Sequence, residues 1–117
     1  LAYQMEGKAA EALKNFEKAL EIDPNLINVL GFAAATELRS GNPQKAVARV
    51  KAHIEKMPDN PLVYNMLGRL YIATKDIDKA EKALLKAIEI KEDLVGPYMD
   101  LGSIYAARGT FDEAAAR

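Results

Sequence analysis

Apolar and polar residues alternate with a helical period in two neighbouring stretches of residues 61–94. The apolar face of the first stretch carries Tyr64, Leu67, Gly68 and Tyr71. The apolar face of the second carries Ile77, Ala80, Leu84, Ala87 and Ile88. This spacing of three and four residues predicts two amphipathic helices joined by a short polar turn. Neither helix could bury its apolar face alone, so the pair needs neighbouring helices in the rest of the chain.

The same pattern recurs along the chain with a constant step of 34 residues. Alanine follows this step at Ala12, Ala46, Ala80 and Ala114. The turn between helices follows it at Gly7, Gly41, Lys75 and Gly109. A period of this length predicts an all-α helical repeat of antiparallel helix pairs. We expect whole repeats at 27–60 and 61–94, the C-terminal part of a repeat at 1–26 and an incomplete repeat at 95–117.

Local signals place the ends of the predicted helices. We expect helices over 8–22, 26–40, 43–57, 77–91 and 98–108, another that begins at Pro61, and breaks at Gly7 and Gly109 with a short helix over 111–117. Asn42, Asn60 and Asp76 are predicted N-caps, and Thr110 with Glu113 matches a capping box. Lys75 stands where the other units have glycine, so we expect it to adopt a positive φ.

Composition narrows the classes of partner. The 117 residues include 16 basic and 17 acidic side chains, a formal charge of −1, and no cysteine. This balance gives no electrostatic reason to bind nucleic acid, and no apolar run is long enough for membrane insertion by this segment. The sequence starts without methionine and ends inside a predicted helix, so we expect it to be part of a longer chain whose compartment it leaves open.

Together these residues resemble the tetratricopeptide repeat family. The match includes Tyr64, Leu67, Gly68, Tyr71, Ala80, Leu84 and Ala87, with Phe16, Pro24 and Pro58 in other units. The resemblance implies a right-handed α-solenoid of about 3.3 repeats, in which the first helix of each pair lines a concave groove. It also implies a protein-interaction scaffold. The chain departs from the family pattern at Glu37, His53, Lys75 and Glu92.

In that geometry, the groove would be lined by residues of the first helices that point away from the second helices. These are Asn28, Phe32, Arg39, Leu62, Asn65, Met66, Arg69, Met99, Asp100 and Ser103. Phe32, Met66 and Met99 form a candidate apolar strip expected to touch no neighbour, with methionine suited to an adaptable surface. The alternative is that the strip pads the solenoid or receives a helix outside this sequence.

Polar groove residues suggest how a peptide could be held. Arg39 and Arg69 could bind a carboxylate and Asn65 an extended backbone; the alternative is two solvated arginines. Some family members grip the C-terminal carboxylate of heat-shock chaperones with lysines, asparagines and an arginine. That pattern is missing here, because Gly31, Ala35, Gly96 and Asp100 occupy several of its positions.

Signals for catalysis are absent from the sequence. His53 is the single histidine, and we interpret it as a packing residue with a satisfied ring nitrogen. No nucleophile triad, phosphate loop, metal site or cofactor site is predicted. We therefore expect no enzyme but a scaffold that binds a peptide or helix of a partner protein in the concave groove. The alternatives are a repeat array that stacks on further repeats or a second copy, and the recognition arm of a larger enzyme.

Overall fold

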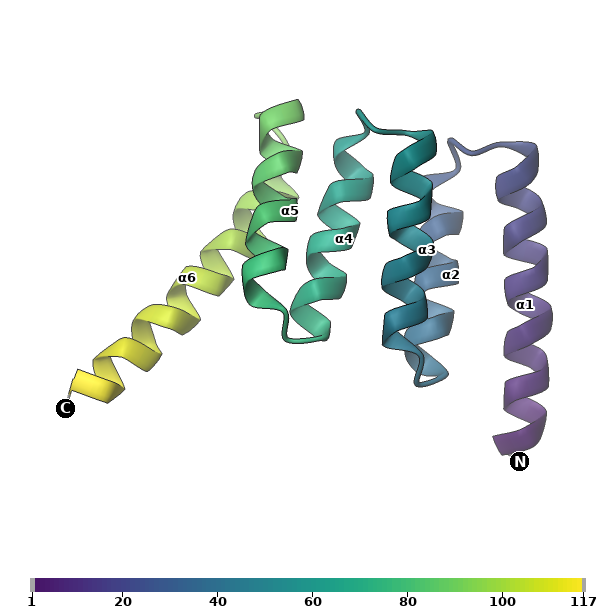
Figure 1. Cartoon of the computed structure of the whole chain (residues 1–117), viewed down its shortest axis with the longest axis horizontal. Coiled ribbons are helices and arrows are strands. Elements are labelled where there is room, and N and C mark those ends of the chain that lie inside the picture. The colour runs from purple at the N-terminus through teal and green to yellow at the C-terminus, as the bar shows by residue number, and fades with distance from the viewer. Residues whose placement is uncertain (1, 117) are drawn as a thin grey trace. The chain divides into compact units, whose positions relative to one another are not determined.

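The computed structural model describes the backbone of residues 2–116 and the side chains of residues 7–109. All regular structure in this part of the chain is α-helical (Figure 1). The helices are α1 (Ala2–Ile22), α2 (Ile27–Arg39), α3 (Pro43–Lys56), α4 (Pro61–Ala73), α5 (Ile77–Ile90) and α6 (Val95–Ala116). The chain divides into two compact units, one up to Pro58 and one from Asp59 on. We describe each unit by itself.

The first unit contains α1, α2 and α3. Helix α2 packs against both α1 and α3. The core of this unit is built from residues at the predicted apolar positions, with Leu30, Ala46 and Val50 at 1%, 0% and 0% exposed. Because Ala34 and Ala46 are small, the backbones of α2 and α3 can approach closely while Leu30 and Val50 fill the remaining space.

The second unit contains α4, α5 and α6. Helices α4 and α5 pack as a pair, and α6 packs against both of them. At the closest approach of α4 and α5, a Cβ on Gly68 would lie 2.7 Å from Leu84 Cδ2. The absence of a side chain at Gly68 therefore lets the buried Leu84 fill this contact. Leu101 and Ile104 of α6 are also buried.

The turns inside the two helix pairs confirm the repeat step. Gly41 has φ 78° and Lys75 has φ 65°, so the predicted positive φ of Lys75 is correct. Asn60 caps α4 as predicted, since its Oδ1 accepts a hydrogen bond from Leu62 N at 2.9 Å. Asn42 and Asp76 occupy the predicted N-cap positions, but neither side chain makes a cap hydrogen bond.

The predicted breaks at Gly7 and Gly109 are wrong. Helix α1 runs through Gly7 and α6 runs through Gly109, so no separate helix forms over 111–117. A glycine inside a helix costs only ~1 kcal/mol. At so small a cost a helix can continue through a glycine, so the repeat position alone does not impose a turn. The predicted capping box of Thr110 and Glu113 lies outside the described side chains.

Candidate functional site

Three predicted groove residues meet on the first-helix side of the second unit. Asn65 and Arg69 lie one turn apart on α4, and Asp100 lies on α6. Asn65 Nδ2 and Arg69 Nε both donate to Asp100 Oδ2, at 3.0 and 2.9 Å. The Arg69 bond is charge-assisted, which makes it the stronger of the two. This face can therefore hold a carboxylate, and in this structure it holds one of its own.

Exposure differs sharply within this cluster. The Asp100 side chain is 18% exposed, whereas that of Arg69 is 65% exposed. Arg69 donates to Asp100 through Nε, and its side chain as a whole remains largely exposed. Gly96 lies against the amide of Asn65, and a Cβ at this position would overlap Asn65 Oδ1. The missing side chain at Gly96 thus leaves the room that Asn65 occupies.

Apolar side chains flank the cluster. Met99 is 65% exposed and Leu62 is 48% exposed, while Met66 is half-buried. Ser103 Oγ donates to Met99 O at 3.1 Å, inside its own helix. This face therefore combines exposed apolar side chains with polar hydrogen-bonding groups.

The other predicted groove residues belong to the first unit. Asn28, Phe32 and Arg39 are all exposed on α2. The Phe32 ring lies 6.0 Å from the ring of Phe16 on α1, tilted by 37°. The expectation that Phe32 touches no neighbour is therefore wrong. The sequence analysis matched Phe16 only to the family pattern and did not predict this pair.

Sequence reasoning also missed the role of Arg49. From α3, its Nη1 donates to Glu17 of α1 and its Nη2 to Glu37 of α2, each at 3.0 Å. Glu37 is 4% exposed, so the departure at this position buries a carboxylate that needs a cationic partner. The sequence contained one signal of this role, since an arginine stands at a repeat position where the other second helices have Asn15 and Ala83.

The interpretation of His53 as a packing residue is confirmed. It is 5% exposed, and its Nε2 lies 2.8 Å from Pro24 O in the loop between α1 and α2. This geometry assigns the proton to Nε2, which donates to the carbonyl. His53 therefore ties α3 to that loop.

Helices α5 and α6 are joined by a further polar cluster. Arg108 donates to Glu81 at 2.8 Å and to Asp78 at 3.0 Å. The neighbouring Glu81 carboxylate raises the pKa of Tyr105 above its usual value of 10.0, and the positive charge of Arg108 opposes this effect. The cluster positions α6 on α5 and lies among exposed side chains.

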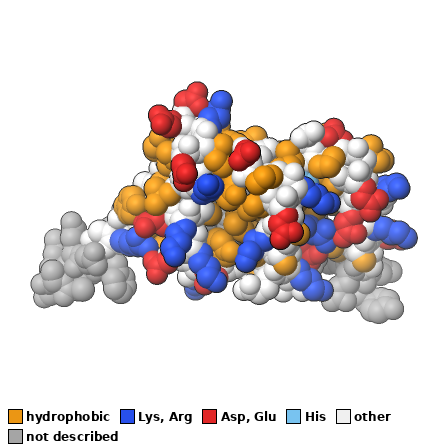
Figure 2. Space-filling model, turned by 45° about the horizontal axis from the view of Figure 1, so that its top comes forward, with side chains coloured by type: hydrophobic (Ala, Val, Ile, Leu, Met, Phe, Trp, Pro, Cys, Tyr) orange, Lys and Arg blue, Asp and Glu red, His pale blue; other side chains and the backbone are white. Residues whose placement is uncertain are grey.

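Acidic and basic side chains are interspersed on the face of the molecule that Figure 2 shows. Among the residues with described side chains, no three His, Cys, Asp or Glu residues form a group that could hold a metal ion. No helix in the described part of the chain has the length and apolar character needed to span a membrane.

The profile of the tetratricopeptide repeat family matches residues 3–67 and 37–95. The chain belongs to the tetratricopeptide repeat family. Members of this family generally mediate protein–protein interactions, and the helix pairs described above are its repeats. The departures at Glu37 and His53 are therefore departures within a tetratricopeptide repeat.

Differently named proteins are similar to this chain. Photosystem I assembly protein Ycf3 of Synechococcus sp. (strain CC9605) is 26% identical over 115 residues, which cover 86% of this chain and 66% of that protein. MamA of Desulfovibrio magneticus RS-1 matches with a TM-score of 0.67 and 22% identity, over 94% of this chain and 62% of that one. This chain thus spans about two thirds of the length of these relatives.

A further tetratricopeptide repeat structure contains a peptide. The first such domain of Spaghetti (RPAP3), bound to the HSP90 peptide SRMEEVD, matches with a TM-score of 0.69 and 19% identity, over 92% of this chain and 85% of that one. At this identity the likeness shows the fold alone.

Proposed function

We propose that this chain is a non-catalytic interaction module that binds a peptide or helix of a partner protein on the first-helix faces of its repeats. In the second unit the face consists of Leu62, Asn65, Met66, Arg69, Met99, Asp100 and Ser103. In the first unit it consists of Asn28, Phe32 and Arg39. The family supports a protein partner, and the residues on these faces support the kind of contact.

The observation that carries the proposal is the combination of Asn65, Arg69 and Asp100 with exposed apolar neighbours. Asn65 and Arg69 converge on one carboxylate oxygen, so the face is preorganised to accept or exchange a polar group. Preorganised donors lose little conformational entropy on binding. Met99 and Leu62 beside them offer apolar area that an incoming side chain would bury.

Asp100 determines which polar groups of a peptide this face would bind. A peptide carboxylate would have to displace Asp100 from Asn65 and Arg69, whereas a peptide amide could bond the cluster while the ion pair stays. The proposal therefore favours an extended or helical segment that contacts the cluster through neutral polar groups and buries apolar side chains on Met99 and Leu62. A peptide anchored by its terminal carboxylate fits this face less well.

The test uses the chain as bait and compares two matched substitutions. Leu62 and Leu85 are 48% and 47% exposed, but Leu62 lies on the first-helix face and Leu85 on α5. Partners are captured with the wild-type chain, Leu62→Ala/Met99→Ala and Leu85→Ala, and quantified by mass spectrometry. We expect the first variant to lose a partner by about tenfold or more, and Leu85→Ala to retain it.

Two further readouts separate this proposal from its alternatives. Both variants should keep the melting temperature, because the substituted side chains are 47% to 65% exposed. Equal capture by all three chains would contradict the proposal. Light scattering that shows a mass rising with concentration, and restored to the monomer by Leu62→Ala/Met99→Ala, would assign the face to self-association.

A further inference from the structure

Helix α6 has two apolar faces in the second unit. One is buried through Leu101 and Ile104. The other carries Tyr98, Gly102 and Tyr105, spaced by four and three residues. The two tyrosines are 49% and 50% exposed, and Gly102 is exposed between them. We call these three residues the α6 stripe, and an exposed apolar surface of this kind is typical of interaction sites.

The same residue types are covered in the neighbouring repeat. One repeat step before the α6 stripe stand Tyr64, Gly68 and Tyr71 of α4. Gly68 and Tyr71 are buried, and Leu84 of α5 lies against Gly68. At Gly102, in contrast, an added Cβ would meet no neighbouring atom within 4 Å. The α6 stripe thus has the residues that α4 uses to pack on α5, but no second helix covers it within the described side chains.

The end of α6 does not fold back over this stripe. The repeat step places the second helix of the pair after Gly109, but α6 continues through Gly109 to Ala116 as one helix. Residues that extend a helix cannot pack on the side of that helix. A cover for the α6 stripe would therefore have to come from a different helix.

Helix α1 carries a face that matches the α6 stripe. Its Ala12, Phe16 and Ala19, which we call the α1 stripe, stand two repeat steps before the α5 residues Ala80, Leu84 and Ala87. The three α5 residues are fully buried in the pair with α4. The three α1 residues are only half-buried. The α1 stripe is therefore the α5 side of a helix pair, incompletely covered.

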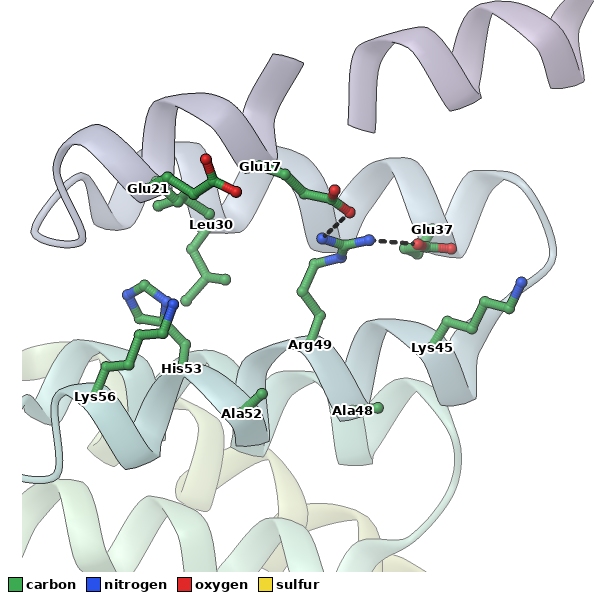
Figure 3. A pocket seen from close by; sticks show the side chains of 11 residues that line it. Glu17, Glu21, Leu30, Glu37, Lys45, Ala48, Arg49, Ala52, His53 and Lys56 are labelled. Carbon is green, nitrogen blue, oxygen red and sulfur yellow. Dashed lines mark hydrogen bonds and ion pairs between the residues drawn. The ribbon is translucent and has the colours of Figure 1, made fainter. Parts of the chain in front are cut away.

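The neighbours of α1 leave this stripe accessible. Helix α2 reaches it through Phe32, whose ring lies 6.0 Å from that of Phe16. Glu17 and Glu21 of α1 line the cleft toward α3, so α3 faces a different side of the helix (Figure 3). Phe16 stays half-buried despite its contact with Phe32, and a further helix could cover the rest of its ring.

Charge contributes little to either stripe. Between Val95 and Gly109, the charged residues of α6 are Asp100 and Arg108, and both are paired inside the second unit. Between Lys8 and Ile22, α1 has three lysines and three glutamates. Recognition between the stripes would therefore depend on shape, with a glycine that admits a close approach and a large side chain that fills the contact.

We propose that the α6 stripe of one copy packs on the α1 stripe of a second copy, and that the two helices form a further pair of the α4–α5 kind. Phe16 of the second copy then lies at Gly102, as Leu84 lies at Gly68 within the chain. A second copy is the partner that the molecule itself supplies, because every chain carries one stripe of each kind. Since the two stripes differ, the contact joins copies head to tail.

This contact is independent of the proposed function. The α6 stripe shares no residue with the first-helix faces, where α6 contributes Met99, Asp100 and Ser103. The contact therefore adds an interaction surface to the chain, and either proposal can fail while the other stands.

The test measures the average mass by sedimentation equilibrium from ~10 µM to ~1 mM, the range in which weak contacts become populated. Gly102→Arg blocks the α6 stripe, and Ala12→Arg blocks the α1 stripe. Ala107→Arg and Ala10→Arg place the same side chain at exposed positions on other sides of α6 and α1, so they are the matched controls.

We expect the wild-type mass to rise about twofold or more above the 12.8 kDa of one chain. Gly102→Arg alone and Ala12→Arg alone should remain monomeric. An equimolar mixture of these two variants should reach the mass of a dimer and stop there, because each variant contributes one intact stripe. Both controls and Leu62→Ala/Met99→Ala should associate like wild type, and added salt should not dissociate the copies.

A check of folding accompanies the mixture. Gly102 has open space around it, so Gly102→Arg should keep its melting temperature. If Ala12→Arg lowers the melting temperature, Ala9→Arg takes its place, because Ala9 is half-buried on the same side of α1.

Four results would overturn the proposal. Two are a wild-type chain that stays monomeric throughout the range, and a mixture of the two folded variants that does so. The third is an Ala12→Arg chain that still associates, which would indicate a contact between two α6 helices. The fourth is loss of association in Leu62→Ala/Met99→Ala, which would assign the contact to the first-helix faces. If association follows the expected pattern while Leu62→Ala/Met99→Ala loses no captured partner, the proposed function fails and the head-to-tail contact stands.

Discussion

The helix pairs α2–α3 and α4–α5 have the same fold but fill the same three repeat positions by different means. The first pair has Glu37, Arg49 and His53, and the second has Tyr71, Ala83 and Ala87. In the second pair all three residues are buried, with Tyr71, Ala83 and Ala87 at 8%, 7% and 0% exposed. In the first pair an ion pair and a histidine occupy the space, and a cleft remains.

The difference separates what the repeat requires from what it tolerates. Both pairs keep alanine at the point where the helices cross, Ala46 and Ala80, each 0% exposed. The three variable positions accept either apolar residues or charged residues, even though Arg49 Nε in the charged set is buried without a hydrogen-bond partner. The charged residues Glu37, Arg49 and His53 line a cleft of about 550 Å³.

The largest expected effect comes from removing the ion pair between Arg49 and Glu37 in the first pair. Arg49→Ala leaves the carboxylate of Glu37 buried without its cation, which should lower the free energy of unfolding by ~3 kcal/mol. Adding Glu37→Tyr copies Tyr71 and Ala83 into the first pair and should recover most of that loss. Urea denaturation followed by circular dichroism measures both. Glu17→Gln serves as a control, because Glu17 is about half exposed and its pairing is worth at most ~1 kcal/mol. An Arg49→Ala chain as stable as wild type would show that the pair is not needed.

The second prediction concerns the contact at which the two helices of a pair approach closely. Gly68 faces Leu84 in the second pair, and Ala34 and Val50 hold these repeat positions in the first. Gly68→Ala places a methyl group against Leu84, and we expect overpacking to cost ~1–2 kcal/mol. Leu84→Val removes a carbon at the contact, so the double variant should be more stable than the sum of the single effects. Thermal unfolding of the three chains forms the cycle, and strict additivity would contradict this account.

A smaller effect is expected at the turn of each pair. Lys75 has φ 65° and its counterpart Gly41 has φ 78°. A residue with a side chain is strained in this region, so Lys75→Gly should raise the free energy of unfolding by ~0.5–1 kcal/mol. Gly41→Lys should lower it by a similar amount, as the melting temperatures of the two variants can show. A decrease for Lys75→Gly would mean that the Lys75 side chain contributes more than its backbone strain costs.

The regular step of 34 residues explains how much could be predicted from the sequence. It predicted the turn at Lys75 and placed every end of α2, α3 and α5 within one residue, because those features depend on local pattern. It failed at Gly7 and Gly109, through which α1 and α6 continue without a turn. A glycine at the repeat position therefore does not by itself end a helix.

For the candidate site, the sequence predicted which face is exposed but not which side chains meet. Periodicity identified the exposed face, and Met99 and Leu62 are indeed exposed on it. It could not identify which side chains meet. Arg49 lies 32 residues from Glu17 and Arg69 lies 31 residues from Asp100, and such pairs depend on rotamers and on the packing of separate helices rather than on sequence spacing.

The smallest effect is expected at an exposed position where the two pairs have different residues. Leu85 of α5 is 47% exposed, and Lys51 at the same repeat position of α3 is also exposed. Leu85→Lys should therefore change the free energy of unfolding by less than ~0.5 kcal/mol, as expected for a surface substitution. The same variant measured by light scattering tests the self-association alternative. If it abolishes a dimer that the wild-type chain forms, then the exposed leucine is an interface residue, and the difference between the pairs extends to which surface each one offers to a partner.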